Sequence, residues 1–213
     1  MPTTRDLPAP LPGPASDAER EAAAGVAPQV LLLMGVSGSG KSTVALELQR
    51  VLGWPFQEGD DLHPAANVEK MRAGHPLDDA DRMPWLQAVA KWIDDRLAAG
   101  EPGIITCSNL KRAYRQITVG DRHGVTLVYL KGEEQVIHDR IAQRQHRYMP
   151  SSLLQSQFDT LEEPGLDEHP LVVVVHGTIA QIVTELLKRL ARGTESTTNN
   201  RGTTTVRTGH GRK

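Results

Sequence analysis

The 213-residue sequence contains a single cysteine, Cys107, and therefore cannot form a disulfide within the chain. It has no N-terminal segment with the basic, apolar and cleavage regions of a signal peptide, so we expect a cytoplasmic protein. Its longest apolar runs, residues 30–34 and 171–175, are far shorter than the roughly 20 residues that cross a bilayer. The sequence therefore predicts a protein that is not bound to a membrane.

The chain also has little excess charge. Its 24 Lys and Arg residues nearly balance its 26 Asp and Glu residues, which leaves a formal net charge of −2. A charge this small creates no cationic field that would attract nucleic acid. We therefore expect no nucleic acid partner and look for a small-molecule substrate that is recognised by local groups.

Large apolar side chains are scarce at both ends of the sequence. Residues 1–27 are rich in Pro and Ala, and residues 193–213 form a polar, low-complexity tail. Segments of this kind cannot bury enough apolar surface to offset the entropy lost on ordering. We expect both ends to be disordered and to add little to stability, with one domain at residues 28–192.

Between these ends, short apolar runs alternate with helical patterns. Several of the runs are apolar on both faces, which is typical of a parallel sheet covered by helices, and the alternation predicts an α/β three-layer fold. Trp85 and Trp92 recur at helical spacing, and we interpret them as a core-facing stripe rather than a ligand pocket. The expected strands lie within residues 29–34, 55–61, 103–108, 125–132 and 171–176.

A phosphate-binding pattern follows the first expected strand. Residues 35–42 read GVSGSGKS and match G-x-x-x-x-G-K-[ST] between a strand and a helix. Glycines let the backbone curl until successive N–H groups point at one anion, Lys41 would reach the outer phosphates, and Ser42 would bind Mg²⁺. The sequence thus predicts a site for a nucleoside triphosphate. Its expected residues are Gly35, Ser37, Gly38, Ser39, Gly40, Lys41, Ser42 and Thr43.

An acidic cluster follows the second expected strand and contains Glu58, Asp60 and Asp61. Loops at the carboxyl ends of neighbouring parallel strands converge, so this cluster should face the phosphate loop. An acid in that place can orient or deprotonate a hydroxyl group in line with the γ-phosphoryl group, which indicates a kinase with Asp60, rather than Asp61, as the base. His63 has no second ligand at metal-binding spacing, so we expect it to contact substrate or cap a helix.

Two groups of basic residues follow later in the chain. Lys111, Arg112 and Arg115 come after the third expected strand, where they can bind an anionic substrate group, although a solvated helix face accounts for at least one of the three. Arg140, Arg144 and Arg147 recur at helical spacing. They form either a surface stripe or a set that stabilises the transferring phosphoryl group.

Taken together, these motifs resemble those of the gluconokinases, small P-loop kinases that phosphorylate D-gluconate on its 6-hydroxyl. The resemblance implies a nucleoside-monophosphate-kinase-like fold with a five-stranded parallel sheet and a lid. It also implies ATP as phosphoryl donor, Mg²⁺ as cofactor, gluconate as substrate and a homodimer. The matching stretches, which cover nearly the whole core in order, are residues 34–43, 58–86, 107–115, 128–132 and 153–164.

The resemblance further implies roles for single residues. Lys41, Asp60 and Arg144 would be catalytic, with Arg144 in the lid. Gluconate would be contacted by Asp60, His63, Arg82, Lys111 and Arg115.

The sequence departs from the family pattern at two places, both of which bear on substrate preference. Asn109 stands where a small residue is usual. In the lid, His146, Arg147 and Tyr148 stand at positions that are usually Gly, His and Phe.

Two alternatives remain compatible with these motifs. A kinase of another small acidic alcohol, such as shikimate, would have a similar fold. A non-catalytic, nucleotide-dependent regulatory protein would use the phosphate loop as a switch. The acidic cluster beside that loop favours a kinase over a regulator.

Overall fold

The computed structural model describes residues 13–142 and 151–199. The five expected strands form one parallel sheet in the order β2-β3-β1-β4-β5, so the predicted α/β fold with a five-stranded parallel sheet is confirmed. All neighbouring strands are parallel, so at least one helix lies between each strand and the next one along the chain. The strands are β1 (Val30–Met34), β2 (Phe56–Gln57), β3 (Gly103–Thr106), β4 (Val125–Lys131) and β5 (Leu171–Val174).

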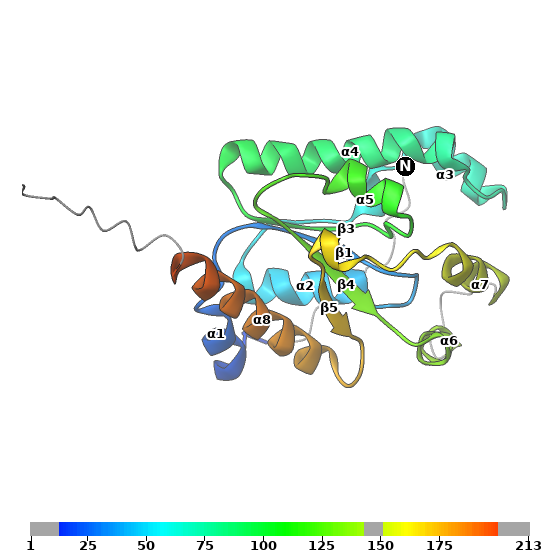
Figure 1. Cartoon of the computed structure of the whole chain (residues 1–213). Helices are drawn as coiled ribbons and strands as arrows, with labels where there is room; N and C mark the ends of the chain where they lie inside the picture. Colours follow the sequence, from blue (N-terminus) through cyan, green and yellow to red (C-terminus); the bar gives the residue numbers. More distant parts are fainter. Residues whose placement is uncertain (1–12, 143–150, 200–213) are drawn as a thin grey trace, which may run out of the picture.

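Helices cover both faces of this sheet (Figure 1). One layer holds α1, α2 and α8, the other holds α3, α4 and α5, and α6 and α7 project beyond the carboxyl ends of the strands. The helices are α1 (Asp17–Ala23), α2 (Lys41–Leu52), α3 (Ala65–Arg72), α4 (Asp79–Ala99), α5 (Arg112–Thr118), α6 (Glu134–Ala142), α7 (Ser151–Thr160) and α8 (Ile179–Asn199). Two short 3₁₀ helices are η1 (Gly59–Leu62) and η2 (Leu166–Glu168).

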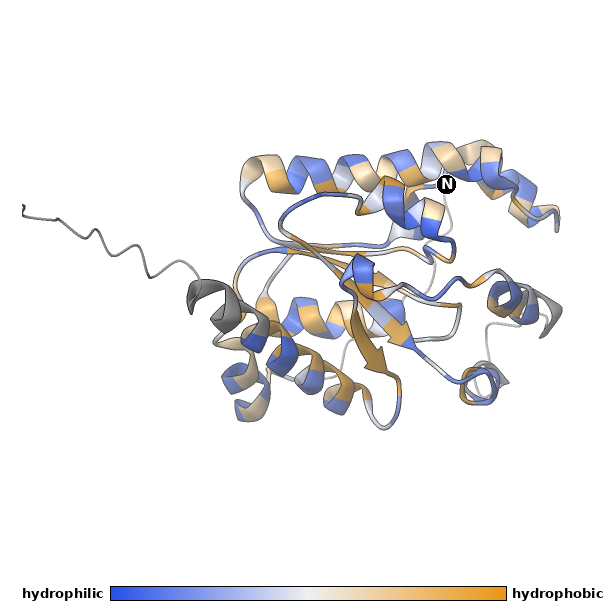
Figure 2. Cartoon of the chain, in the orientation of Figure 1, coloured by the Kyte–Doolittle hydropathy of each residue, from blue (hydrophilic) through white to orange (hydrophobic). Residues whose placement is uncertain are grey.

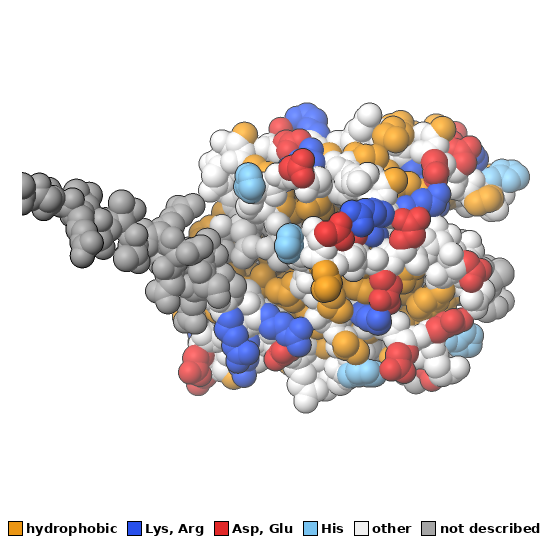
Figure 3. All heavy atoms as spheres, in the orientation of Figure 1, with side chains coloured by type: hydrophobic (Ala, Val, Ile, Leu, Met, Phe, Trp, Pro, Cys, Tyr) orange, Lys and Arg blue, Asp and Glu red, His pale blue; other side chains and the backbone are white. Residues whose placement is uncertain are grey.

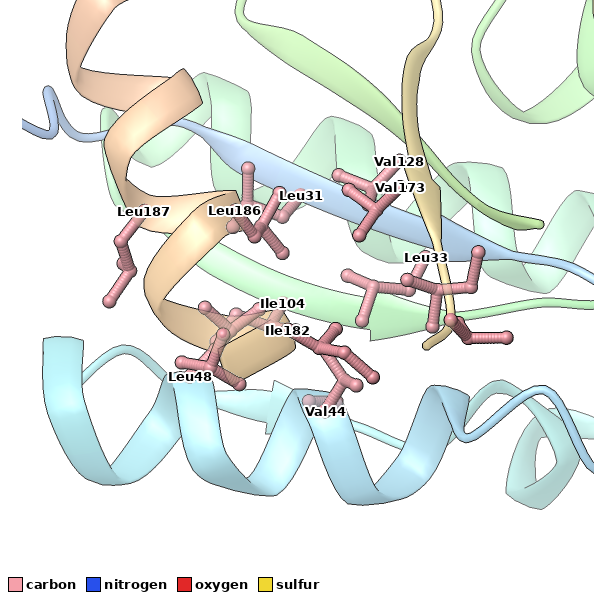
Figure 4. Packing of buried hydrophobic residues seen from close by; sticks show 14 of the residues in the cluster. Leu31, Leu33, Val44, Leu48, Ile104, Val128, Val173, Ile182, Leu186 and Leu187 are labelled. Carbon is pink, nitrogen blue, oxygen red and sulfur yellow. The ribbon is translucent and has the colours of Figure 1, made fainter. Parts of the chain in front are cut away.

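The central strand β1 is apolar throughout because both of its faces are covered. Leu31 and Leu33 pack in the layer of α2 and α8 (Figure 4), whereas Leu32 and Met34 pack against Trp85 of α4. Successive side chains of a strand point to opposite faces, so a five-residue apolar run serves both layers at once. Trp85 is buried in this second cluster, which confirms its interpretation as a core residue. Figure 2 shows the same pattern as hydrophobic strands between helices of mixed polarity.

The face of the molecule drawn in Figure 3 carries charged side chains of both signs. On this face, acidic and basic side chains are interspersed rather than gathered into a large patch of one sign. No helix among the described residues is both long and apolar enough to cross a membrane.

The two ends of the domain differ from the boundaries expected from composition. Residues 17–23, which fall in the expected disordered leader, form α1 and contact α2 and α8. The small side chain of Ala22 is buried there, and Glu19 is buried in an ion pair with Arg50 of α2. Composition missed this helix because a small residue and a paired carboxylate, rather than large apolar groups, attach it. At the other end, α8 continues beyond residue 192 to Asn199.

Candidate active site

The phosphate loop joins the carboxyl end of β1 to the first turn of α2. Gly35, Gly38 and Gly40 have φ values of +141°, +82° and +96°, a region that residues with a side chain rarely adopt. At Gly35, an added Cβ would also lie 2.8 Å from the carbonyl oxygen of Leu130. Gly40 is the N-cap of α2 and offers no side chain to cap the helix, so the N-terminal end of the dipole faces into the loop.

Lys41 lies over this loop. Its ammonium donates hydrogen bonds to the carbonyl oxygens of Gly35, at 3.0 Å, and Val36, at 3.1 Å. The hydroxyl of Ser39 is buried against Gly35 and, among the described residues, is a buried side-chain oxygen without a hydrogen-bond partner. The Lys41 ammonium thus lies against the loop backbone, beside the groups that we expect to bind an anion.

A buried carboxylate connects the loop helix to the two strands beside it. The Ser42 hydroxyl donates to Oε2 of Glu58, and the Thr106 hydroxyl donates to Oε1 of the same carboxylate. Glu58 is only 9% exposed. The sequence analysis placed Glu58 in the acidic cluster without giving it a role. Its position as the first carboxylate after β2 was the signal that could have singled it out.

Asp60 and Asp61 lie on η1, and both are exposed. Burial raises the pKa of the Cys107 thiol at the end of β3 to about 12, and the charges of Asp60, Lys41 and Arg82 also act on this thiol. The charges of three predicted site residues, which lie on three different elements, thus reach the same thiol at the end of β3.

The η1 segment is held in place by α4. The indole N–H of Trp85 donates to the carbonyl oxygen of Gly59 at 2.7 Å, and His63 stacks on the Trp85 ring with 4.2 Å between centroids. A Cβ at Gly59 would lie 1.8 Å from the carbonyl oxygen of Thr106, so only glycine fits. The acidic cluster is thus positioned by core contacts, and His63 borders it.

Lys111 pairs with Asp79 at the start of α4, with 2.7 Å between Nζ and Oδ1. The Tyr114 hydroxyl donates to the same carboxylate. The hydrogen bond from Lys111, followed by that from Tyr114, lowers the pKa of Asp79, and the charge of Arg82 acts in the same direction. Lys111 and Arg82 are therefore brought close to one another across α4 and α5.

Arg115 lies elsewhere than the resemblance implied. Its side chain is 2% exposed, and its guanidinium donates to both carboxylate oxygens of Glu168, at 2.6 and 2.9 Å. Its remaining bonds go to backbone carbonyl oxygens of residues 109, 110 and 162. Arg115 occupies the inner face of α5, one turn beyond Lys111, and in this structure it holds the segment after α7 rather than facing the site.

Asn109 is also turned inward. It has a φ of +46°, which Asn tolerates better than most residues, and its side-chain N–H donates to the Thr118 hydroxyl at 2.9 Å. Its Oδ1 accepts a hydrogen bond from the Cys107 thiol. The residue that departs from the family pattern thus stabilises the turn between β3 and α5.

The expected lid lies between α6 and α7. Arg144, together with His146, Arg147 and Tyr148, lies outside the described residues. Within the described part, α7 contributes a contact that the sequence analysis missed, because the backbone N–H of Ser37 donates to Oε1 of Gln157 at 2.6 Å. Residues 153–164 had been noted as a matching stretch, but no role had been given to Gln157.

Several known proteins are similar to this chain in sequence. A family model described as an AAA domain matches residues 30–164. Gluconokinase from Gluconobacter oxydans is 46% identical over 171 residues, covering 80% of this chain and 96% of the relative. Thermoresistant gluconokinase from Escherichia coli is 40% identical over 165 residues, covering 75% and 94%.

Solved structures show the same relationship. The crystal structure of a gluconokinase from Sinorhizobium meliloti superposes with a TM-score of 0.73 at 42% identity and covers 81% of this chain and 97% of that one. An APS kinase from Mycobacterium tuberculosis, at 18% identity and a TM-score of 0.53, shares the fold.

Proposed function

Because the chain belongs to the gluconokinase family, we propose that it transfers the γ-phosphoryl group of ATP to the 6-hydroxyl of D-gluconate, releasing ADP and 6-phospho-D-gluconate. The observation that carries this proposal is the convergence of the phosphate loop, with Lys41, and η1, with Asp60, on one edge of the sheet. The proposal takes these two segments as the donor site and the acceptor base. An in-line transfer requires this arrangement.

The chemistry would depend on positioning and charge. Lys41 would exchange its bonds to the carbonyl oxygens of Gly35 and Val36 for bonds to the outer phosphate oxygens of ATP. Asp60 would orient the acceptor hydroxyl and take its proton as the phosphoryl group arrives. Arg144, implied by the family resemblance, would neutralise charge on the transferring group from the lid.

Mg²⁺ fits the oxygen pair formed by Ser42 and Glu58. A hydroxyl and a carboxylate are hard oxygen ligands, and their hydrogen bond places them within reach of one cation. Among the described residues there is no cluster of three or more His, Cys, Asp or Glu side chains that could hold a metal ion. This is compatible with Mg²⁺, which often takes one or two protein ligands and completes its shell with phosphate and water. Bound there, Mg²⁺ would neutralise the charge on the ATP phosphates.

Gluconate would lie between η1 and the basic groups of α4 and α5. We assign its carboxylate to Lys111 and Arg82, with His63 at the border of the pocket. The carboxylate would compete with Asp79 for the Lys111 ammonium, so binding would exchange one ion pair for another. Arg115 is left out of this assignment because its donors are directed at Glu168 and backbone carbonyl groups.

The proposal extends to the oligomeric state, the domain bounds and the cellular location of the enzyme. We propose a homodimer, supported by two exposed apolar side chains near the sheet edge, Leu166 at 92% and Val174 at 49% exposure. We propose a kinase domain that runs from α1 to α8. A cytoplasmic location is supported by the free thiol of Cys107, since thiols persist in a reducing compartment.

An ADP-release assay with a panel of acceptors tests the function. We expect release that depends on gluconate and exceeds that with shikimate at equal concentration. Faster release with shikimate would favour a kinase of another acidic alcohol. Release unaffected by any acceptor would favour the nucleotide-dependent regulator and overturn the proposal.

A further inference from the structure

A glutamine side chain from α7 binds the phosphate loop. The hydrogen bond from the Ser37 N–H to Oε1 of Gln157 joins residues 120 positions apart in the sequence. Because the donor is a backbone N–H group, the bonded atom of the amide must be its oxygen. The neutral amide oxygen of Gln157 therefore accepts the hydrogen bond of an N–H group that the loop would otherwise donate to a phosphate oxygen.

The packing of α7 fixes the place of Gln157. Leu154 is buried in the core, and Phe158 and Leu161 pack against the same cluster, at spacings of four and seven residues from Leu154. Just after the helix, the Glu162 N–H donates to the turn before α5 at 2.8 Å. The helix thus lies beside the loop because of its own contacts, and Gln157 does not depend on the Ser37 bond to be there.

We expect Ser37 to lie beside the outer phosphates of a bound triphosphate. The N-terminal end of α2 and the adjoining loop cradle the inner phosphates, whereas the P-loop lysine serves the outer ones. Here the Lys41 ammonium already lies on the carbonyl oxygen of Val36, the residue before Ser37. The terminal phosphate would therefore lie next to both Lys41 and the Ser37–Gln157 contact.

A side-chain amide can accept a hydrogen bond when no nucleotide is bound and donate one when a nucleotide is bound. Its oxygen accepts a hydrogen bond, and its NH₂ group donates one. A charged phosphate oxygen is a stronger acceptor than a neutral amide oxygen, so a terminal phosphate would displace Oε1 of Gln157 from the Ser37 N–H. The same amide can then donate its N–H to that phosphate.

We propose that Gln157 is a positioning residue for the terminal phosphoryl group of ATP. It holds the Ser37 N–H in the absence of nucleotide and donates to the γ-phosphate when ATP is bound. It therefore favours a triphosphate over a diphosphate. The inference rests on the proposed function only in taking ATP as the nucleotide, and its test does not require gluconate.

The experiment compares Gln157→Glu and Gln157→Ala with matched changes at Gln155. Gln155 lies on the same helix, is exposed, and donates a local hydrogen bond to Asp159, at 3.0 Å. Dissociation constants for ADP and for the non-hydrolysable triphosphate AMP-PNP are measured by calorimetry with Mg²⁺, and folding is followed by thermal unfolding.

Gln157→Glu keeps an acceptor for Ser37 but puts a negative charge beside the terminal phosphate. We expect it to weaken AMP-PNP relative to ADP by at least about tenfold, and Gln157→Ala to do so severalfold. Both Gln155 variants should leave the ratio of the two constants unchanged.

A ratio that stays within twofold of wild type in either folded Gln157 variant overturns the inference. Equal weakening of ADP and AMP-PNP does so too, because it would mean that Gln157 only supports the loop. Failure of the wild-type protein to phosphorylate gluconate would count against the proposed function and leave this ratio as it is. The two proposals are thus separately refutable.

Discussion

At the scale of single residues, we divide the proposed site into groups that would face the nucleotide and groups that hold the fold. We assign Lys41 and Asp60 to the first kind, whereas the hydrogen bonds of Arg115 and Asn109 put them in the second. All four lie in sequence motifs that match the same family. The motif therefore marks both kinds of residue, and burial separates them.

Lys41→Ala should reduce phosphoryl transfer by about 10²-fold or more, because the lysine neutralises charge that develops on the outer phosphates. Its ammonium donates hydrogen bonds to carbonyl oxygens of the phosphate loop and is not part of the hydrophobic core, so the thermal unfolding midpoint should change little. Steady-state kinetics and calorimetry check the two statements. Near wild-type turnover in the folded variant would refute the assignment of the loop.

Asp60→Asn preserves shape but removes the charge that orients and deprotonates the acceptor hydroxyl. Turnover should therefore fall much more than affinity for ATP, whereas Asp61→Asn serves as the matched neighbour on η1 and should have the smaller effect. Both constants come from the same ADP-release assay. An equal or reversed order of the two variants would show that the other carboxylate is the base.

Arg115→Ala should destabilise the protein by about 3–5 kcal/mol, because it leaves the Glu168 carboxylate, 14% exposed, without its ionic partner. Urea unfolding measures this. In any fraction that remains folded, the KM for gluconate should stay near wild type. A raised KM with unchanged stability would restore the role that the family resemblance implied.

The same pair gives a pH dependence with a defined sign. The hydrogen bond from Arg115 lowers the pKa of Glu168 below its ordinary value of 4.5, so the stabilisation is fully present above about pH 4.5 and is lost as the pH falls through the lowered pKa. The difference in unfolding free energy between wild type and Glu168→Gln should accordingly shrink below pH 4.5. A difference independent of pH would argue against a charged Glu168.

At the scale of elements, the strands were the most predictable features. Continuous apolar runs such as residues 30–34 indicate burial on both faces, so these strands could be read directly, whereas their order in the sheet was not predicted. The helix α1 could not, because Ala22 and the Glu19–Arg50 ion pair carry no hydrophobic pattern. Local sequence also gives no sign of the inward turn of Arg115, which depends on Glu168, 53 residues further on.

Removal of α1 should lower the unfolding midpoint. A chain that begins at residue 25 loses the charged hydrogen bond between Glu19 and Arg50 and the buried Ala22, a loss of about 2 kcal/mol or about 4–8 °C. A chain that begins at residue 13 keeps both and is the control. Turnover should be alike in the two, because α1 and the carboxyl edge of the sheet lie at opposite ends of the molecule (Figure 1). Equal midpoints would mean that α1 contributes nothing.

At the scale of the whole molecule, the site is a consequence of topology. All five strands run the same way, so the phosphate loop after β1, the acidic cluster after β2 and the turn after β3 meet at one edge. That much follows from the sequence once the strands are recognised. The choice among the charged groups at that edge does not, since it depends on side-chain packing between layers.

Substrate preference should depend on the charged side chains at the carboxyl edge of the sheet. Gluconate offers a hydroxyl near Asp60 and a carboxylate for Lys111 and Arg82, whereas glucose lacks the carboxylate. Loss of a charge-assisted contact is worth about 1.5–3 kcal/mol, so kcat/KM for glucose should be lower by roughly ten- to a hundredfold or more. Comparable kcat/KM values would reject the assignment of the carboxylate.

The contact between α1 and α8 also sets an order of events during synthesis. Among the described helices, α1 is made earliest and packs on α8, which is made latest, and 155 residues separate the end of α1 at residue 23 from the start of α8 at residue 179. At about 5–20 residues per second, the nascent chain waits about 8–30 s with the core surface that α8 covers still open to solvent. Leu186, Leu187 and Leu190 complete that core only at the end. A chain that ends before α8 would thus expose the apolar surface of β1 and α2 that α8 covers. Such a chain would depend on chaperones even though it contains all of the proposed catalytic residues.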